Sequence, residues 1–273
     1  MKVFEDAGIT EFPKTPEAFV AALETIKESN PEVTPLYTNY AAGWTLSNWD
    51  FTRTGVSGDP DVTTKMAEDS APFEAGDTMN TIYDVLFQVA EKGLIEADPT
   101  TSDWEQSKLD LASGNVAVMV LGSWAVPQIQ ELAEGHEEDI TFQTFPVTAT
   151  DGKQYMGVGG DYNLAINVNS EHKEAARTLL DWLINESDYA VDNGGLQAVK
   201  GGDYPASLKA SQEAGVVLLE ENAAPEGKES LFSDVNNMSE LVVGATDLEK
   251  QRIIDAAIGN TDETFEEIMA DFN

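Results

Sequence analysis

The sequence predicts an α/β fold, and two kinds of pattern along the chain lead to this prediction. Residues 115–121 form a short continuous apolar run rich in valine, which is typical of a strand buried on both faces of a sheet. Residues 16–29 and 171–186 instead place apolar side chains at helical spacing. Such strands and helices alternate along a chain of 273 residues, of which 41% are hydrophobic. This length suits one large domain or two smaller lobes around a packed core.

The first part of the chain is predicted to be mainly helical. Thr15 is a suitable helix cap, Pro16 fits the first helical turn, and Asn30 followed by a proline ends the apolar periodicity. The aromatic-rich residues 34–55 indicate a short strand followed by a loop and a helix. Further helices are expected over residues 78–92 and 104–111.

The run at 115–121 ends in Gly122-Ser123-Trp124, where a strand gives way to a helix. Ser123 is expected to cap that helix, and Pro127 falls in its first turn, where a missing N–H does little harm. The remaining elements are expected in this order: a strand over 141–146, a glycine-rich and then strand-like stretch over 151–170, a helix over 171–186 capped by Ser170, and two or three helices after residue 205.

Charge is the most unusual property of the composition. Lys and Arg number 15 and Asp and Glu number 50, which gives a formal net charge of −35. So acidic a surface argues against nucleic-acid and anionic-lipid partners, because phosphate binding needs clustered cations. The simplest interpretation is a solubility adaptation, to salt or to an exposed cell surface. An acidic face that docks a basic partner is the alternative.

Several kinds of chemistry find no support in the sequence. There is no cysteine, which excludes disulfides and thiol catalysis, and His136 and His172 stand apart without metal-ligand spacing. The glycines at 157–160 lie between strand-like segments and not before a helix, so they do not indicate a dinucleotide loop. No metal and no cofactor is therefore expected. The N-terminus lacks an apolar signal segment and no long apolar run follows, so a soluble molecule is expected, whatever precedes it in the gene.

The tryptophans are the strongest candidates for ligand contact. Trp124 leaves a buried strand at its carboxyl end, which is where open α/β sheets place their ligands. An indole beside the hydroxyl of Ser123 and the first N–H groups of a helix suits a sugar, which has apolar C–H faces and a rim of hydroxyls. Trp44 follows another predicted strand. Packing against the core is the alternative for both, and Trp104 and Trp182 are expected to be core residues.

Three segments, in their order and spacing, form a pattern shared with a known family. They read FEDAGITEFPKTPEAFVAALETIK, NVAVMVLGSWAVPQI and GGDYNLAINVNSEHKEAARTLLDWLI. The pattern resembles bacterial extracellular solute-binding proteins, in particular the maltose-binding-protein-like sugar receptors of ABC transporters. The resemblance implies the type II periplasmic-binding-protein fold, in which ligand is clamped between two α/β lobes that are joined by hinge crossings.

The resemblance also implies how the lobes divide the chain. Residues 1–156 and 204–273 would form the C-terminal lobe, and residues 157–203 would supply the hinge crossing and a remnant of the N-terminal lobe. Most of the N-terminal lobe is expected to be missing, as in a shortened chain or gene fragment. The segment 161–203 would then pack onto the main lobe or onto a second copy of the chain, which gives a homodimer through the incomplete lobe.

Carried over position by position, the resemblance suggests a set of ligand-binding residues. Trp124 matches the stacking tryptophan of the family, with Ser123 beside it, and Trp44 falls near a second aromatic contact. The other expected contacts are Gly160 and Asp161 in the crossing segment, where Asp161 would accept from sugar hydroxyls, and Asn237.

The function implied by the resemblance is non-enzymatic binding of a mono- or oligosaccharide and its delivery to an ABC transporter permease. The full-length protein would be extracellular or periplasmic and tethered to the membrane as a lipoprotein. Two alternatives stay open: a shortened chain that acts as an interaction module and binds no solute, and a glycoside hydrolase that uses two of the many carboxylates.

Overall fold

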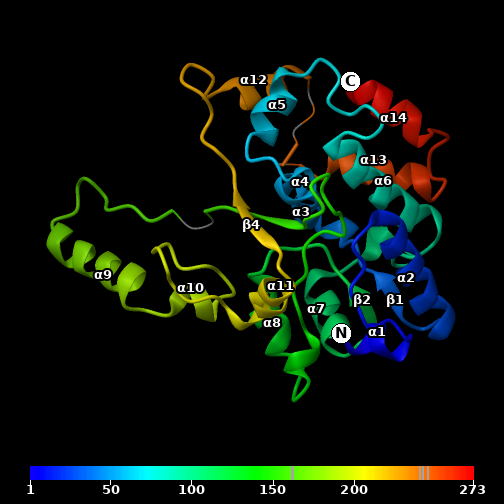
Figure 1. The fold of residues 1–273 in the computed structure, drawn as a ribbon, viewed down its shortest axis with the longest axis horizontal. Helices are drawn as coiled ribbons and strands as arrows, with labels where there is room; N and C mark the ends of the chain where they lie inside the picture. Colours follow the sequence, from blue (N-terminus) through cyan, green and yellow to red (C-terminus); the bar gives the residue numbers. More distant parts are fainter. Residues whose placement is uncertain (161–162, 240, 242, 245) are drawn as a thin grey trace.

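The computed structural model describes residues 1–160, 163–239, 241, 243–244 and 246–273 of the chain (Figure 1). Its strands are β1 (Thr34–Leu36), β2 (Val116–Val118), β3 (Tyr155–Val158) and β4 (Val217–Glu220). Its α-helices are α1 (Lys2–Asp6), α2 (Pro16–Ser29), α3 (Ser47–Phe51), α4 (Arg53–Ser57), α5 (Val62–Glu68), α6 (Thr78–Glu91), α7 (Trp104–Ala112), α8 (Ala125–Gln130), α9 (Lys173–Asn185), α10 (Tyr189–Asp192), α11 (Lys209–Glu213), α12 (Leu231–Ser239), α13 (Leu248–Ala257) and α14 (Phe265–Phe272). Single 3₁₀ turns are η1 (Tyr40–Ala42), η2 (Trp44–Leu46), η3 (Pro99–Thr101), η4 (Glu137–Asp139) and η5 (Ala206–Leu208).

Within the described residues the strands form two separate parallel pairs. In the first pair, Thr34 of β1 lies opposite Val116 of β2, and Leu36 lies opposite Val118. In the second pair, β3 lies beside β4 in register. Parallel pairs joined by helical connections confirm the predicted α/β class.

The main core lies among α2, α6, α13 and α14, which gather on one side of the molecule (Figure 1). The helices carry apolar stripes at the predicted spacing, so that Leu23, Leu86 and Ile254 are completely buried. Thr15 caps α2 as expected, because its side chain accepts a hydrogen bond of 3.2 Å from the Ala18 N–H. A smaller apolar cluster lies under α8 and includes Val126.

A buried charge network holds the main core together. The ammonium of Lys250 lies 2.6 Å from Asp50 Oδ2, and both side chains are fully buried. Asp50 also accepts hydrogen bonds from the Tyr83 hydroxyl (2.8 Å) and from the Gly244 N–H (2.7 Å). Burial, together with the adjacent Asp50 carboxylate, raises the pKa of Tyr83 well above its ordinary value. The network therefore joins α3, α6 and α13 through groups that satisfy one another.

Residues 163–203 make an excursion from the main body. Figure 1 shows α9 standing away from the other helices, with α10 leading back toward α11. Neither α9 nor α10 contains a buried residue, and the apolar side chains Leu179 and Trp182 of α9 are 60% and 50% exposed. The helix was predicted correctly, but its apolar face does not pack onto the main body. Among the described helices, none combines the length and apolar character that a membrane span requires.

The structure corrects several details of the sequence prediction. Residues 141–146 form no strand, and Thr144 bonds to the Tyr155 carbonyl through its side chain instead. Strand β4 lies where only helices were expected. The predicted caps Ser123 and Ser170 are wrong, because residues Trp124 and His172 hold the cap positions without a side-chain bond. Strand β2 covers only part of residues 115–121, and only its first residue is buried, since its sheet has one neighbouring strand among the described residues.

Replacement of Lys250 by methionine should destabilise the fold strongly. The Lys250→Met change leaves the Asp50 carboxylate buried without its cation, and breaking such a pair costs about 3–5 kcal/mol. Urea unfolding followed by circular dichroism measures the loss. The control is Lys228→Met, which removes an ion pair with Glu68 that is largely open to solvent and should change stability little. Equal stabilities of the two variants would contradict the role assigned to the buried network.

Candidate functional site

Three tryptophans meet at one place on the surface. The ring centroids of Trp44 and Trp104 are 5.3 Å apart in an edge-to-face arrangement, and those of Trp44 and Trp124 are 5.8 Å apart with a tilt of 37°. Trp104 and Trp124 are 6.1 Å apart. Trp44 is 49% exposed, and the other two rings are half-buried. We call these three residues the tryptophan cluster.

The parallel β1–β2 pair brings two of these rings together. Trp44 lies in the loop that follows β1, and Trp124 lies in the turn that follows β2. Because the strands are parallel, both loops leave the sheet at the same edge. A backbone bond of 2.9 Å from the Tyr37 N–H to the Val118 carbonyl continues the pairing beyond the strands. The position predicted for both tryptophans at the carboxyl ends of strands is therefore confirmed.

The loop before Trp44 is fixed by hydrogen bonds to a buried carboxylate. Glu96 accepts from the Thr38 N–H (2.8 Å), the Thr38 hydroxyl (2.6 Å) and the Asn39 N–H (3.1 Å). Asn39 takes the left-handed conformation, with φ of 59°, that turns the chain toward Trp44. Burial raises the pKa of Glu96 above its ordinary value, although the Thr38 bonds act to lower it.

Gly43 and Tyr40 complete the shape of this loop. Gly43 has φ of 65° and ψ of −70°, a conformation that strains any other residue, and a Cβ there would collide with the Asp247 carboxylate. The Tyr40 hydroxyl donates to Asp255 Oδ2 at 2.9 Å. Burial, with the hydrogen bond to Asp255, raises the pKa of Tyr40 to about 12. The loop is therefore tied to α13 on the side next to Trp44.

Gly122 explains the Gly-Ser-Trp turn. The Trp124 indole folds back over the backbone of Gly122, so that a Cβ at residue 122 would lie 2.6 Å from the ring carbon Cδ1. Only glycine leaves room for the ring at this place. The ring packs with one part against the small cluster under α8 and remains partly open to solvent. Core packing and surface exposure, which the sequence presented as alternatives for Trp124, therefore occur together.

The polar donors expected beside Trp124 are only partly free. The N–H groups of Ala125 and Val126 donate to the carbonyls of Gly122 and Ser123, both at 3.1 Å. Residue Gly194 of the excursion is buried against this turn, and a Cβ on it would meet the Ser123 carbonyl and Pro127 Cδ, the latter at 3.1 Å. Because these backbone groups are already engaged, the hydroxyl of the adjacent residue Ser123 is the polar group expected to bond to a ligand beside Trp124.

The structure describes two of the other three predicted contacts. Gly160 is exposed at the exit of β3, and a Cβ added to it would meet open space. Asp161 lies outside the described residues. Asn237 is exposed on α12, which packs beside α5 at the opposite end of the molecule from α7 and α8 (Figure 1). The structure thus brings together Trp44, Ser123 and Trp124 from the predicted set.

Two tryptophans were assigned incorrectly from the sequence. Trp104 was expected in the core, but it joins the cluster at the first residue of α7, directly after the capping residue Asp103. Trp182 was expected in the core and is half exposed on α9. All three cluster residues stand at or next to the start of a helical segment, but this position alone does not distinguish a cluster residue from a core residue.

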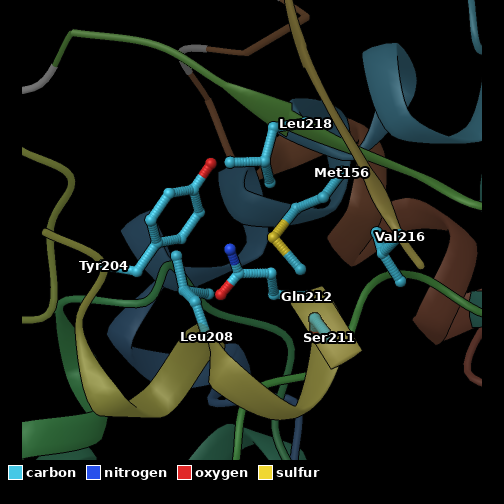
Figure 2. Close-up of a pocket in the computed structure, with 7 residues that line it drawn as sticks. All are labelled: Met156, Tyr204, Leu208, Ser211, Gln212, Val216 and Leu218. Atoms are coloured by element: carbon cyan, nitrogen blue, oxygen red, sulfur yellow. The ribbon is translucent and has the colours of Figure 1, made fainter. Parts of the chain in front are cut away.

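A separate cavity of about 240 Å³ lies between the β3–β4 pair and α11 (Figure 2). Figure 2 shows the Tyr204 ring at one side, with its hydroxyl directed toward Leu218, Met156 across the cavity from it and Leu208 below it. The lining combines the apolar side chains of Met156, Leu208, Val216 and Leu218 with the polar groups of Ser211, Gln212 and Tyr204, and Tyr204 is its one ring. A sugar needs both an aromatic face and several polar partners. The tryptophan cluster offers a sugar more aromatic surface than Tyr204 does, because three rings meet there and Trp44 is half exposed.

Comparison with known proteins identifies relatives of the chain. The sequence profile of a family described as bacterial extracellular solute-binding protein matches residues 1–190. A manno-oligosaccharide-specific solute-binding protein from Bifidobacterium animalis subsp. lactis, solved with mannotriose, is 39% identical with a TM-score of 0.91. That match covers 99% of this chain and 65% of the other, so this chain spans less than two thirds of that relative. No curated protein sequence matches significantly.

Two other solved structures extend the comparison. A binding protein of an ABC transporter from the same organism, solved with mannobiose, is 35% identical with a TM-score of 0.91, covering 99% of this chain and 65% of the other. A sugar transporter protein from Bacillus licheniformis, solved with stachyose, is 17% identical with a TM-score of 0.67, covering 99% and 67%. The last likeness shows the fold alone, and it agrees with the α/β type II fold expected from the sequence.

Replacement of Gly122 by alanine should move the Trp124 ring without unfolding the chain. The added methyl group occupies the place of the indole, so the ring must rotate away from Trp44 and Trp104. Near-UV circular dichroism, which reports coupling between neighbouring indoles, should change clearly. The matched control is Gly159→Ala, where a Cβ meets open space. An unchanged spectrum for Gly122→Ala would show that the turn does not set the ring position.

The buried Glu96 should make its own contribution to the pH dependence of stability. Because its pKa in the folded state is raised, the folded chain keeps this proton to higher pH than the unfolded chain. Its contribution is complete below the ordinary value of 4.5 and is lost as pH rises through the folded pKa. The difference in unfolding free energy between the wild type and Glu96→Gln should therefore fall as pH rises.

A second carboxylate provides the control for this pH experiment. Arg252 lowers the pKa of Glu263 through a side-chain hydrogen bond, so the stabilisation by Glu263 is present above 4.5 and is lost as pH falls. The difference between the wild type and Glu263→Gln should accordingly have the opposite slope. The same slope for both variants would contradict the environment assigned to Glu96.

Proposed function

Because the chain belongs to the bacterial extracellular solute-binding proteins, we propose that it binds a carbohydrate at the tryptophan cluster and delivers it to an ABC transporter permease. The single observation that carries this proposal is the meeting of Trp44, Trp104 and Trp124 at the edge where β1 and β2 end. Ring faces held in this way stack on the C–H faces of sugar rings, while indole N–H and hydroxyl groups bond to sugar hydroxyls. The bound sugar is carried unchanged, without catalysis.

Manno-oligosaccharides are the proposed ligand class. Two relatives of 39% and 35% identity were solved with mannotriose and mannobiose. Trp44 and Trp124 support a ligand of at least two rings, because their centroids are 5.8 Å apart, which is similar to the spacing of successive sugar rings. A ligand that covers two adjacent indole rings buries more apolar surface than a single sugar unit does, and this burial favours binding.

The chain would supply one wall of the site. We assign residues 1–156 and 204–273 to one lobe and residues 157–203 to the hinge crossing and part of a second lobe. The exposed position of α9 supports this division, since an amphipathic helix of this kind needs a partner for its apolar face. Gly160 and Asp161 would then contact the sugar from the crossing segment, and Asn237 would contribute only to a ligand that reaches α12.

The family description supports a location outside the cytoplasmic membrane. In the full-length form a lipid anchor would keep the receptor near its permease, so that released sugar is captured close to the transporter. The strongly acidic surface, with a net charge of −35, favours solubility in such a setting.

Mannotriose binding measured by calorimetry tests the proposed function. The wild type should bind with saturable heat, and Trp124→Ala should weaken binding about tenfold or more, because one of the stacking rings is lost. Trp182→Ala is the matched control, since it removes an exposed indole on α9, which stands away from α7 and α8 (Figure 1), and should leave binding unchanged. Absence of binding across mono- and oligosaccharides would reject the receptor function, and turnover of an aryl mannoside would favour a hydrolase instead.

Self-association through α9 is a second proposed property. The helix exposes apolar side chains, and its own charges cancel, since Lys173 and Arg177 offset Glu174 and Asp181. The chain has a net charge of −35, so two copies repel each other over most of their surface. The repulsion is weaker at α9, because the charges of this helix cancel. We therefore assign a second copy of the chain as the occupant of this face when the chain is alone.

Sedimentation at several protein concentrations tests this assignment. The wild type should form dimers at high concentration, and Leu179→Glu should give monomers, because it places a charge in the apolar face. Thr178→Glu, which adds the same charge at the neighbouring position, is the control and should still associate. A wild type that remains monomeric at every concentration contradicts the proposal.

A further inference from the structure

A largely buried lysine side chain lies against one ring of the tryptophan cluster. Lys108 lies on α7 one turn after Trp104, and only 8% of the residue is exposed. Its ammonium is 5.0 Å from the centroid of the Trp104 ring, within the range of a cation–π interaction. The same ammonium lies 2.9 Å from Glu105, in an ion pair between residues three positions apart on the helix.

The ion pair with Glu105 alone does not account for the burial of the Lys108 side chain. The Glu105 side chain is 76% exposed, so water screens its attraction for Lys108. Only 11% of the Lys108 side chain is exposed, so protein groups surround most of it. The face of the Trp104 ring gives the ammonium a second favourable contact, and the strength of this interaction depends on where the ring stands. The lysine therefore favours one orientation of the ring over others.

The orientation of Trp104 affects both of its neighbours in the cluster. Trp104 lies edge to face with Trp44 at an interplanar angle of 74°, and it is tilted by 57° against Trp124. A rotation of the Trp104 ring would remove the edge contact with Trp44, which is the most exposed ring of the three. The arrangement of the other two rings thus depends on the orientation of Trp104, which Lys108 contacts.

We propose that Lys108 is a positioning residue of the carbohydrate site, which holds the tryptophan cluster in its binding geometry through the face of Trp104. This inference rests on the proposed function and adds to it a residue that need not touch the sugar. Free rings pay an ordering cost when ligand binds, and rings that are already held do not. Loss of the cation should therefore weaken binding and also change the ring geometry in the absence of any sugar.

Three variants separate the cation from the ion pair. Lys108→Met keeps the aliphatic stem and removes the charge, Lys108→Arg keeps the charge, and Glu105→Gln removes only the partner of the ion pair. Lys108→Met should weaken mannotriose binding about three- to tenfold, which is the range expected for loss of a partly desolvated cation–π contact. Lys108→Arg should recover most of the loss, and Glu105→Gln should bind like the wild type.

The near-UV circular dichroism of the sugar-free proteins is the second measurement, taken at low temperature where every variant is folded. Lys108→Met should change the signal from the coupled indoles, and Glu105→Gln should not. This measurement decides the inference even if the wild type binds no mannotriose, a result that would reject only the proposed function. The positioning role would be overturned if Lys108→Met kept the spectrum and the affinity of the wild type. It would also be overturned if Lys108→Met and Glu105→Gln had equal effects.

Discussion

The parallel pairing of β1 with β2 is the constraint on which the candidate site depends. The pair is short, with Thr34 opposite Val116 and Leu36 opposite Val118. Parallel strands must leave a sheet at the same edge, so the loop with Trp44 and the turn with Trp124 have to meet there. A bond of 3.0 Å from the Leu36 N–H to the Leu94 carbonyl brings the segment of Glu96 to the same edge. The carboxylate that fixes the loop is therefore placed by the same backbone contacts.

The aromatic rings at this edge are each packed against the protein on one side and exposed on the other. Trp124 packs against the small apolar cluster under α8, and Gly122 provides the room for its ring. Trp44 follows Gly43, whose left-handed backbone keeps the loop close to Asp247. Each ring therefore has one supported part and one free part. Rings supported in this way need less ordering when ligand binds, which reduces the entropic cost of binding.

The sequence was sufficient to predict the α/β class, the long helices and two of the three cluster tryptophans. These features depend on local patterns, such as the apolar stripe of α2 or a valine-rich run followed by a turn. Trp104 was missed because its neighbours in the sequence look like any helix start, and only the tertiary fold brings it to Trp44. The short apolar run of β4 was visible in the sequence, but without its partner β3 nothing distinguished it from a helix segment. Trp182 was placed in the core because its helix is amphipathic, whereas the partner of that apolar face is not among the described residues.

The central claim is that the edge of the β1–β2 pair seats a sugar on indole rings. A crystal structure of the chain soaked with mannotriose tests this claim most directly. The account predicts sugar carbons stacked on the faces of Trp124 and Trp44, with hydroxyls bonded to polar groups of the adjoining loops. Mannotriose in the cavity beside Tyr204, or at a surface without tryptophan, would contradict it.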